Sequence, residues 1–235
     1  MTYSSALRGN EPESQDYGKI VASDGWSYQL TPDDILWLAR SVDFEGGTSP
    51  EAVIWTYAQR LALPGIRNQY HTLTALVRAH SQPVNPKWAR DGMFCRPGGY
   101  YADKPECSEA KLARRDRAST IAWDDIGPRV RDAVTKFAHA ELPNPVPRSV
   151  DFADDRVSTG FLARNPSARV VMKAGNWFIG TAQSLLWPDG HVSVHYKGAQ
   201  SGEAPGSGNE GIGVGLVVLA LAAAAGVVWW MRSRS

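Results

Sequence analysis

The stretch TPDDILWLARSVDFEGGTSP, residues 31–50, decides the fold because it carries the signals of one complete amphipathic helix. Thr31 offers a hydroxyl that caps the first turn, and Pro32 suits the first helical position. One face has the apolar spacing of a core-facing helix and consists of Ile35, Leu38, Ala39 and Val42. Gly46 and Gly47 end the helix. The sequence therefore predicts a helix that packs into a core and ends at a glycine pair.

Glu45 continues this apolar face one turn beyond Val42, which makes it a candidate for a buried general acid. A carboxylate at this place loses hydration and lies beside the negative end of the helix dipole. Both effects favour its protonated form. The glycines that follow leave room for a ligand backbone or a sugar ring. The alternative is an ordinary surface glutamate that precedes a glycine cap.

Three segments resemble, in order and spacing, parts of the spore-cortex-lytic cell-wall hydrolase family. LARSVDFEGG, residues 38–47, is similar to the catalytic-helix motif, and Glu45 follows Arg40 at the distance of the family's catalytic Glu. AELPNPVPRSVDFA, residues 140–153, is similar to the family's Gly-x-x-x-Asp-Pro-Thr segment. GNWFIG, residues 175–180, is similar to its Ile-Gly-Asn-His-x-Phe-Tyr strand.

The resemblance implies a lysozyme-like domain that cleaves the glycan strand of peptidoglycan between N-acetylmuramic acid and N-acetylglucosamine. Such an enzyme is a lytic transglycosylase or a muramidase, uses one Glu as acid and then as base, and needs no cofactor. The chain departs from the family at a His-Tyr pair, which is Asp151-Phe152 here, and at the strand His, which is Trp177. The family's roles at these positions therefore do not transfer.

A glycosidase with two carboxylates would need a partner for Glu45. Asp43 faces away from Glu45 on the same helix, so Asp151, beside the second family match, is the better candidate. Three further residues are predicted to contact substrate, namely Gln59, Tyr100 and Asn176. The helix expected from residue 71 breaks at SQPVNP, where Ser81, Gln82, Asn85 and Trp88 either face sugar or form a plain polar connector.

Cys95 and Cys107 bracket a short loop rich in Pro and Gly, so their side chains can meet. We expect a disulfide in an oxidising compartment and two free thiols in a reducing cytosol. A peptide-bond hydrolase that uses Cys95 would need a His close to it in the fold. His191 and His195 lie on one face of an expected strand, roughly 13 Å apart, too far to share a zinc ion. No metal or cofactor is predicted.

Along the chain the pattern predicts an α+β, mainly helical domain over residues 26–197, after an N-terminal extension over residues 1–25. Further helices are expected from Ser49, from Ser108 as a cap, and over residues 128–141. A small late sheet is expected from short apolar runs at residues 169–173, 176–180 and 191–196, with a hairpin turn at residues 188–190.

The C-terminal end predicts a membrane anchor. Residues 198–210 are rich in Gly, Ser and polar residues and predict a flexible linker. Residues 211–231, GIGVGLVVLALAAAAGVVWWM, are long and apolar enough for a transmembrane helix in a lipid bilayer, and their small residues leave self-association open. The basic tail, residues 232–235, places the C-terminus in the cytoplasm.

The N-terminal sequence lacks the pattern of a secretory signal, although the anchor orients the domain away from the cytoplasm. A phage or virion enzyme for phage entry or host lysis reconciles the two, either in a virion membrane or in a bacterial inner membrane with the domain facing the periplasm. A host lysis pathway that releases the folded enzyme late also reconciles them. A net charge of +1 gives no sign of a nucleic-acid binder, and nine tryptophans suit either a core or a sugar platform. The alternative function is a membrane-anchored virion or envelope structural protein that binds peptidoglycan without cleaving it.

Overall fold

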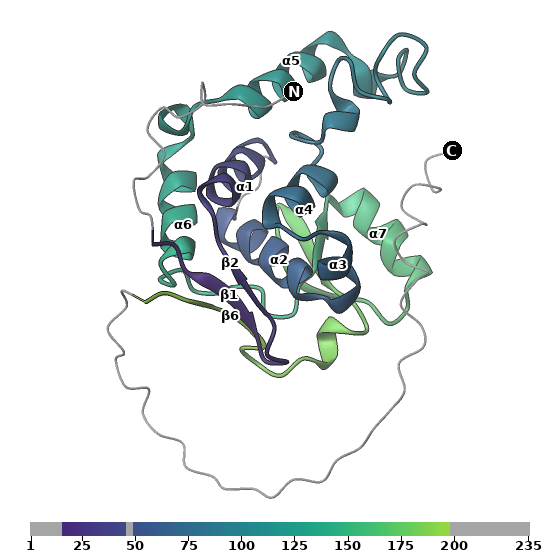
Figure 1. Ribbon diagram of the computed structural model, residues 1–235. Coiled ribbons are helices and arrows are strands. Elements are labelled where there is room, and N and C mark those ends of the chain that lie inside the picture. Colours follow the sequence, from purple (N-terminus) through teal and green to yellow (C-terminus); the bar gives the residue numbers. More distant parts are fainter. Residues whose placement is uncertain (1–15, 46–48, 198–235) are drawn as a thin grey trace, which may run out of the picture. The chain divides into compact units, whose positions relative to one another are not determined.

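The computed structural model describes residues 16–45 and 49–197, which form an α+β unit made mainly of helices, with two small sheets (Figure 1). The α+β prediction is confirmed. The predicted linker, transmembrane helix and basic tail, residues 198–235, lie outside the described residues. Within the described residues, no helix combines the length and the apolar character needed to cross a membrane.

Seven α-helices and four short 3-10 turns make up the helical part of the described residues. The α-helices are α1 (Pro32–Phe44), α2 (Pro50–Ala62), α3 (Pro64–Gln69), α4 (Leu73–His80), α5 (Glu109–Thr120), α6 (Pro128–Ala138) and α7 (Asp155–Arg164). The 3-10 turns are η1 (Pro86–Trp88), η2 (Pro105–Cys107), η3 (Trp123–Asp125) and η4 (Ser184–Leu186). Helix α1 packs against α4 and α6, and α2 packs against the same two helices. These four helices enclose most of the hydrophobic core.

Helix α1 begins as the sequence predicts. Thr31 accepts a hydrogen bond from the Asp34 backbone N–H, and the Asp34 carboxylate accepts one from the Thr31 N–H, which is the reciprocal pattern of a capping box. Asp34 is fully buried, and its oxygens also accept bonds from the Tyr28 hydroxyl at 2.7 Å and the Thr74 N–H at 2.8 Å. One carboxylate thus joins the start of α1 to the strand before it and to α4.

Two other helix predictions differ in detail from the structure. Ser108 takes the N-cap position of α5, but its side chain makes no capping hydrogen bond. Helix α6 ends at Ala138 rather than at Glu141, because Ala140 adopts a left-handed backbone conformation with φ of 62°.

The first sheet joins the two ends of the described chain. Strand β1 (Lys19–Ala22) lies between β2 (Ser27–Gln29) and β6 (Val192–His195), and both pairings are antiparallel. Ile20, which is fully buried, faces Tyr28 on one side and Val194 on the other. The central strand of this sheet therefore falls within residues 1–25, which the sequence assigned to an N-terminal extension.

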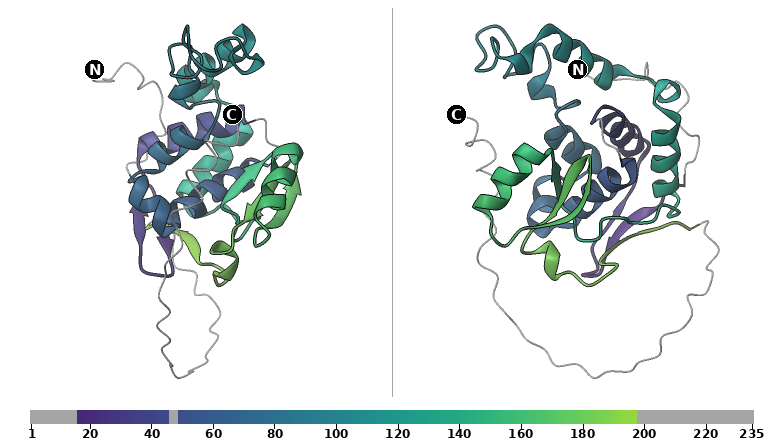
Figure 2. Two further views of the ribbon diagram at one scale, coloured as in Figure 1. Left: turned by 90° about the vertical axis from the view of Figure 1, so that its right-hand side faces the viewer. Right: turned by 180° about the vertical axis from the view of Figure 1, so that it is seen from behind.

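The second sheet contains two of the three strands of the predicted late sheet, in the order β3 (Asp151–Ala153), β5 (Asn176–Gly180) and β4 (Arg169–Ala174). The third predicted strand, at residues 191–196, belongs to the first sheet. The predicted strands at 169–173 and 176–180 pair antiparallel around Gly175, whose φ of 76° suits a tight turn. The predicted hairpin at 188–190 is wrong. Its turn forms, but it leads from η4 into β6, which pairs with β1 in the other sheet. Helix α7 packs against β3 and β5 (Figure 2).

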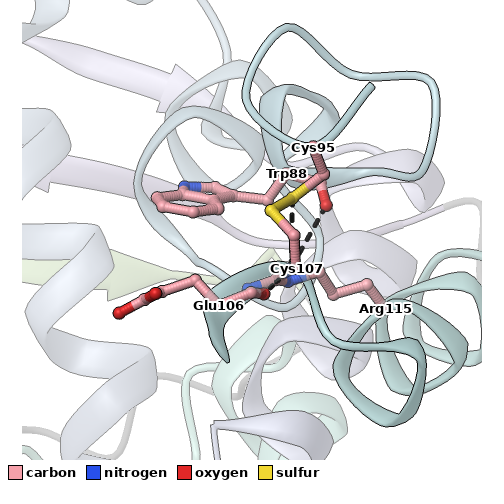
Figure 3. Close-up of a disulfide and its surroundings, with 5 residues drawn as sticks. All are labelled: Trp88, Cys95, Glu106, Cys107 and Arg115. Carbon is pink, nitrogen blue, oxygen red and sulfur yellow. Dashed lines mark hydrogen bonds between the residues drawn. A yellow bond between two sulfur atoms is a disulfide. The ribbon is translucent and has the colours of Figure 1, made fainter. Parts of the chain in front are cut away.

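A disulfide joins Cys95 and Cys107, with their Cα atoms 5.4 Å apart, in the segment between α4 and α5 (Figure 3). The bridge lies in a small apolar cluster of its own with Trp88 and Leu112. Buried Arg115 completes this cluster, since its Nη1 donates to the Glu106 carbonyl at 2.7 Å and its guanidinium lies 5.1 Å from the Trp88 ring centroid. The segment is thus held by a covalent bond, a small core and one buried cation.

Candidate functional site

Glu45 lies at the end of α1, where its backbone N–H donates to the Ser41 carbonyl at 2.9 Å. Its carboxyl oxygen Oε1 accepts a hydrogen bond of 2.7 Å from the Ser81 hydroxyl. Ser81 accepts in turn from the Ser41 hydroxyl at 2.8 Å. Both serines are fully buried. A chain of two buried hydroxyls therefore fixes the carboxyl group at the C-terminal end of the helix.

The surroundings of Glu45 raise its pKa from an ordinary value of 4.5 to about 7. Loss of hydration is the largest cause, and the Ser81 hydrogen bond and the charge of Arg114 oppose it in part. The residue as a whole is only half-buried, although protein atoms crowd its carboxyl group. Glu45 thus combines a carboxyl whose pKa lies near neutral pH with partial exposure of the residue as a whole, and such a pKa suits a proton donor to a bound ligand.

Tyr57 of α2 is another buried polar residue near Glu45, with Ser41 and Ser81. Its hydroxyl lies beside Ser41 and Ser81, and burial together with the nearby charge of Glu45 raises its pKa. The phenol therefore stays neutral and serves as a fixed dipole. Its ring packs edge-on against Phe152 with centroids 5.6 Å apart. Phe152 of β3, which stands at one of the positions where the chain departs from the resembled family, thereby supports the site from the second sheet.

Both candidates for a second carboxylate make hydrogen bonds to partners other than Glu45. Asp151 accepts hydrogen bonds from Arg60 Nη1 at 3.1 Å and from the Phe152 N–H at 2.9 Å. Asp43 accepts from the Gly127 N–H at 3.1 Å, where it binds the start of α6. Over residues 16–45 and 49–197, no hydrogen bond or ion pair joins Glu45 to either one. Each of the two acids is thus engaged by its own partner, and their role beside Glu45 stays a prediction.

The three predicted substrate contacts lie in different places. Gln59 is buried, and it binds the carbonyls of Val146 and Ser149 and the N–H of Arg148, so it holds a loop in place. Tyr100 is 65% exposed in the disulfide-bonded segment. Asn176 is half-buried at the start of β5. Among the contacts of the described residues, none connects these three side chains to Glu45.

The sequence did not single out Ser41, Tyr57 or Arg114. Ser41 stands one helical turn before Glu45, a spacing that places it on the same side of α1. Nothing in the pattern of α2 or α5 signals that Tyr57 or Arg114 approaches Glu45. Ser81 belongs to the SQPVNP break that was expected to face sugar or to be a plain connector, and the structure gives it the bond to Glu45.

Two other chemistries fit the structure less well. Cys95 is bonded to Cys107 and so offers no thiol for nucleophilic attack. Each histidine of the HVSVH run has a hydroxyl neighbour, His191 with Ser23 at 2.6 Å and His195 with Ser193 at 3.0 Å. In the part of the chain that the structure describes, no three His, Cys, Asp or Glu side chains gather in a way that suits a metal ion.

Comparisons of this chain with protein-family models, with curated proteins and with solved structures found no match. Function must therefore be inferred from the chemistry that Glu45 and its neighbours offer.

Proposed function

We propose that this protein cleaves the glycan strand of peptidoglycan, between N-acetylmuramic acid and N-acetylglucosamine, with Glu45 as both general acid and general base. The observation that carries the proposal is the Glu45 carboxyl at the end of α1, bound by Ser81 and with a pKa of about 7. A carboxyl with this pKa is half protonated near neutral pH, so one group serves both directions of proton transfer.

The reaction begins with Glu45 protonated. It donates its proton to the glycosidic oxygen as the bond from that oxygen to the sugar's anomeric carbon breaks. The Glu45 carboxylate then takes a proton from the nucleophile that attacks the anomeric carbon. A water nucleophile leaves a reducing end, as in a muramidase, and the sugar's own 6-hydroxyl leaves an anhydro end, as in a lytic transglycosylase. The proton balance closes in both cases without a cofactor.

The environment of Glu45 supports both halves of this cycle. Burial favours the protonated form that acts first, whereas the Ser81 hydroxyl and the charge of Arg114 favour the carboxylate that acts second. The engagement of Asp43 and Asp151 elsewhere favours a mechanism with one carboxylate. The resemblance of three segments to cell-wall hydrolases supports the substrate and a lysozyme-like fold. It also agrees with a phage or virion enzyme that a helix at residues 211–231 anchors to a membrane.

The second candidate is a virion or envelope protein that binds peptidoglycan without cleaving it. One observation favours this alternative. Trp177, which replaces a family His, is half-buried, and the Lys173 ammonium lies 3.4 Å from its ring centroid. An indole ring has no group that transfers a proton near neutral pH, whereas its apolar body suits contact with a ligand.

The test uses the full chain in detergent with purified peptidoglycan, and mass spectrometry of the soluble fragments. Glu45→Gln keeps the size of the side chain and an acceptor for Ser81 but removes the acid. Glu109→Gln makes the same change at an exposed carboxylate of α5 that pairs with Arg90. We expect wild type and Glu109→Gln to release anhydro or reducing ends and Glu45→Gln to release none. Equal release by Glu45→Gln contradicts the proposal. Binding without release by wild type establishes the alternative.

A further inference from the structure

A groove of about 400 Å³ lies between the exposed side of α4 and the segment that follows it. Its walls include the small apolar side chains of Ala75, Ala79 and Pro86, and its charged members are Arg78 and Lys87. The described residues that line it include no Asp or Glu. Asn85 braces the groove, because its side-chain amide donates to the Ala79 carbonyl at 2.7 Å and thereby holds the segment after α4 against the end of that helix.

Arg78 is held in position but lacks a hydrogen-bond partner at one atom. Its guanidinium carbon lies 4.4 Å from the ring centroid of Trp37, so a cation–π contact fixes the plane of the group. Its Nε is buried and has no hydrogen-bond partner among the described residues. Arg78 itself lines the groove, so its positive charge is available to an anionic ligand there. Arg40 lies 4.9 Å from the centroid of the same ring and donates from its Nε to the Ile121 carbonyl, away from the groove lining.

Lys87 supplies the other cation of the groove. It is exposed, and in the described part of the chain it takes part in no ion pair. Thr74, which lines the groove, donates hydrogen bonds to the Asp34 carboxylate. That carboxylate is fully buried, and it also accepts hydrogen bonds from Thr31 and Tyr28. The groove therefore presents positive charge between apolar walls, a combination that suits an acid group on a small aliphatic chain.

We propose that this groove is a subsite for the carboxylate-bearing peptide stem that branches from muramic acid. This inference rests on the proposed function and names the part of the substrate beyond the scissile bond. The glycan strand itself is uncharged, so the stem carries the carboxylates, and its alanine methyl groups match the apolar walls. Helix α4 connects the two places directly, since Ala79 lines the groove and Ser81, two residues later, binds Glu45.

The test measures binding by calorimetry with the full chain carrying Glu45→Gln, so that no probe is consumed. The probes are the disaccharide of N-acetylglucosamine and N-acetylmuramic acid with its peptide stem, the same compound with the stem carboxylates amidated, and the bare disaccharide. The variants are Arg78→Gln and Lys87→Gln, with Lys104→Gln as the control because it removes an exposed cation from the disulfide-bonded segment. Arg78→Lys retains the charge without the planar donor group.

We expect Arg78→Gln and Lys87→Gln each to weaken binding of the acid-bearing probe about tenfold, and to leave the amidated and bare probes unchanged. Arg78→Lys should lose less than Arg78→Gln. If Arg78→Gln does not fold, Lys87→Gln carries the test alone. Equal affinity of the Glu45→Gln chain, without further substitution, for the acid and amidated probes overturns the proposal, as does an equal loss with Lys104→Gln.

Two further measurements distinguish the peptide stem from other cell-wall polymers and the subsite from the catalytic proposal. Cell-wall preparations are compared before and after removal of their phosphodiester polymers; a groove that responds to these polymers rather than to stem carboxylates overturns the proposal. Cleavage of stem-free glycan by wild type tests the proposed function without the groove. If no glycan is cleaved while the stem carboxylates still govern binding, the catalytic proposal fails and the subsite is supported.

Discussion

Replacement of Glu45 by Gln should stabilise the fold at alkaline pH, even though it removes the proposed catalytic group. The folded state holds the Glu45 proton up to a pH of about 7, whereas the unfolded chain releases it near the ordinary pKa of 4.5. A folded pKa above the unfolded one means that the native protein binds more protons between these two values. The free energy of unfolding therefore decreases as the pH rises from about 4.5 to about 7 and stays reduced above it.

The magnitude follows from the difference of about 2.5 between the two pKa values. Each pKa unit corresponds to about 1.4 kcal/mol, so a full effect is about 3.5 kcal/mol. Because Glu45 retains some contact with solvent, about 2–3 kcal/mol is the better expectation. Glutamine retains an acceptor for Ser81 and carries no charge to desolvate. For a domain of this size, the difference corresponds to roughly 5–10 °C in Tm.

The assay is chemical denaturation of the full chain, wild type against Glu45→Gln, at a series of pH values from 4 to 9. All other titrating groups occur in both proteins, so the difference between the two isolates Glu45. It should be near zero at pH 4, grow to about 2–3 kcal/mol in favour of Gln by pH 8, and then level off. Glu109→Gln is the control of opposite sign, because Arg90 lowers the pKa of Glu109. A difference for Glu45→Gln that does not change with pH would refute the burial of its carboxyl.

The same structure makes four further predictions. The rate of glycan cleavage should fall as the pH rises through about 7, because the acid step needs protonated Glu45. A pH–rate profile that stays flat from pH 7 to 9 would contradict this. Ser81→Ala should lower the rate about tenfold and move that limb to higher pH, because the lost hydrogen bond favoured the carboxylate; an unmoved limb would exclude this role. Cys95→Ser should cost about 2–3 kcal/mol of unfolding free energy in denaturant, since the bridge closes a short loop. Burial lowers the pKa of His80 to about 3, so the protein should lose stability as the pH falls from about 6.5 toward 3, and His80→Asn should flatten that loss in a pH series of thermal melts.

The sequence predicted best those elements whose interactions connect residues close together in the chain. The start of α1 depends on Thr31, Pro32 and Asp34, which are adjacent in the chain, and the place of Glu45 follows from the helical repeat. The β4–β5 hairpin was also predictable, because its two strands are separated only by Gly175. In each case the interactions that select the structure connect residues within a few positions of one another.

The parts that escaped prediction depend on contacts between distant residues. The strand KIVA at residues 19–22 is too short to signal a strand by alternation, and it becomes the centre of a sheet only through β6. The Ser81 hydroxyl reaches Glu45 across 36 positions, and Gln59 reaches Ser149 across 90. A buried hydroxyl and a loop-binding amide have no sequence pattern of their own, so the surroundings of Glu45 required the structure.

The pairing of β1 with β6 has a consequence for the order in which the domain forms during synthesis. Lys19 and His195 are direct neighbours in the sheet, although nearly the whole described chain lies between them. While the ribosome translates the intervening residues, β1 has only β2 as a partner, and a two-stranded hairpin is marginal in water. The last strand of the described residues therefore closes the sheet only after α1 to α7 have been made. A chain released before residue 192 would expose one edge of β1, which is a template for pairing with another nascent chain.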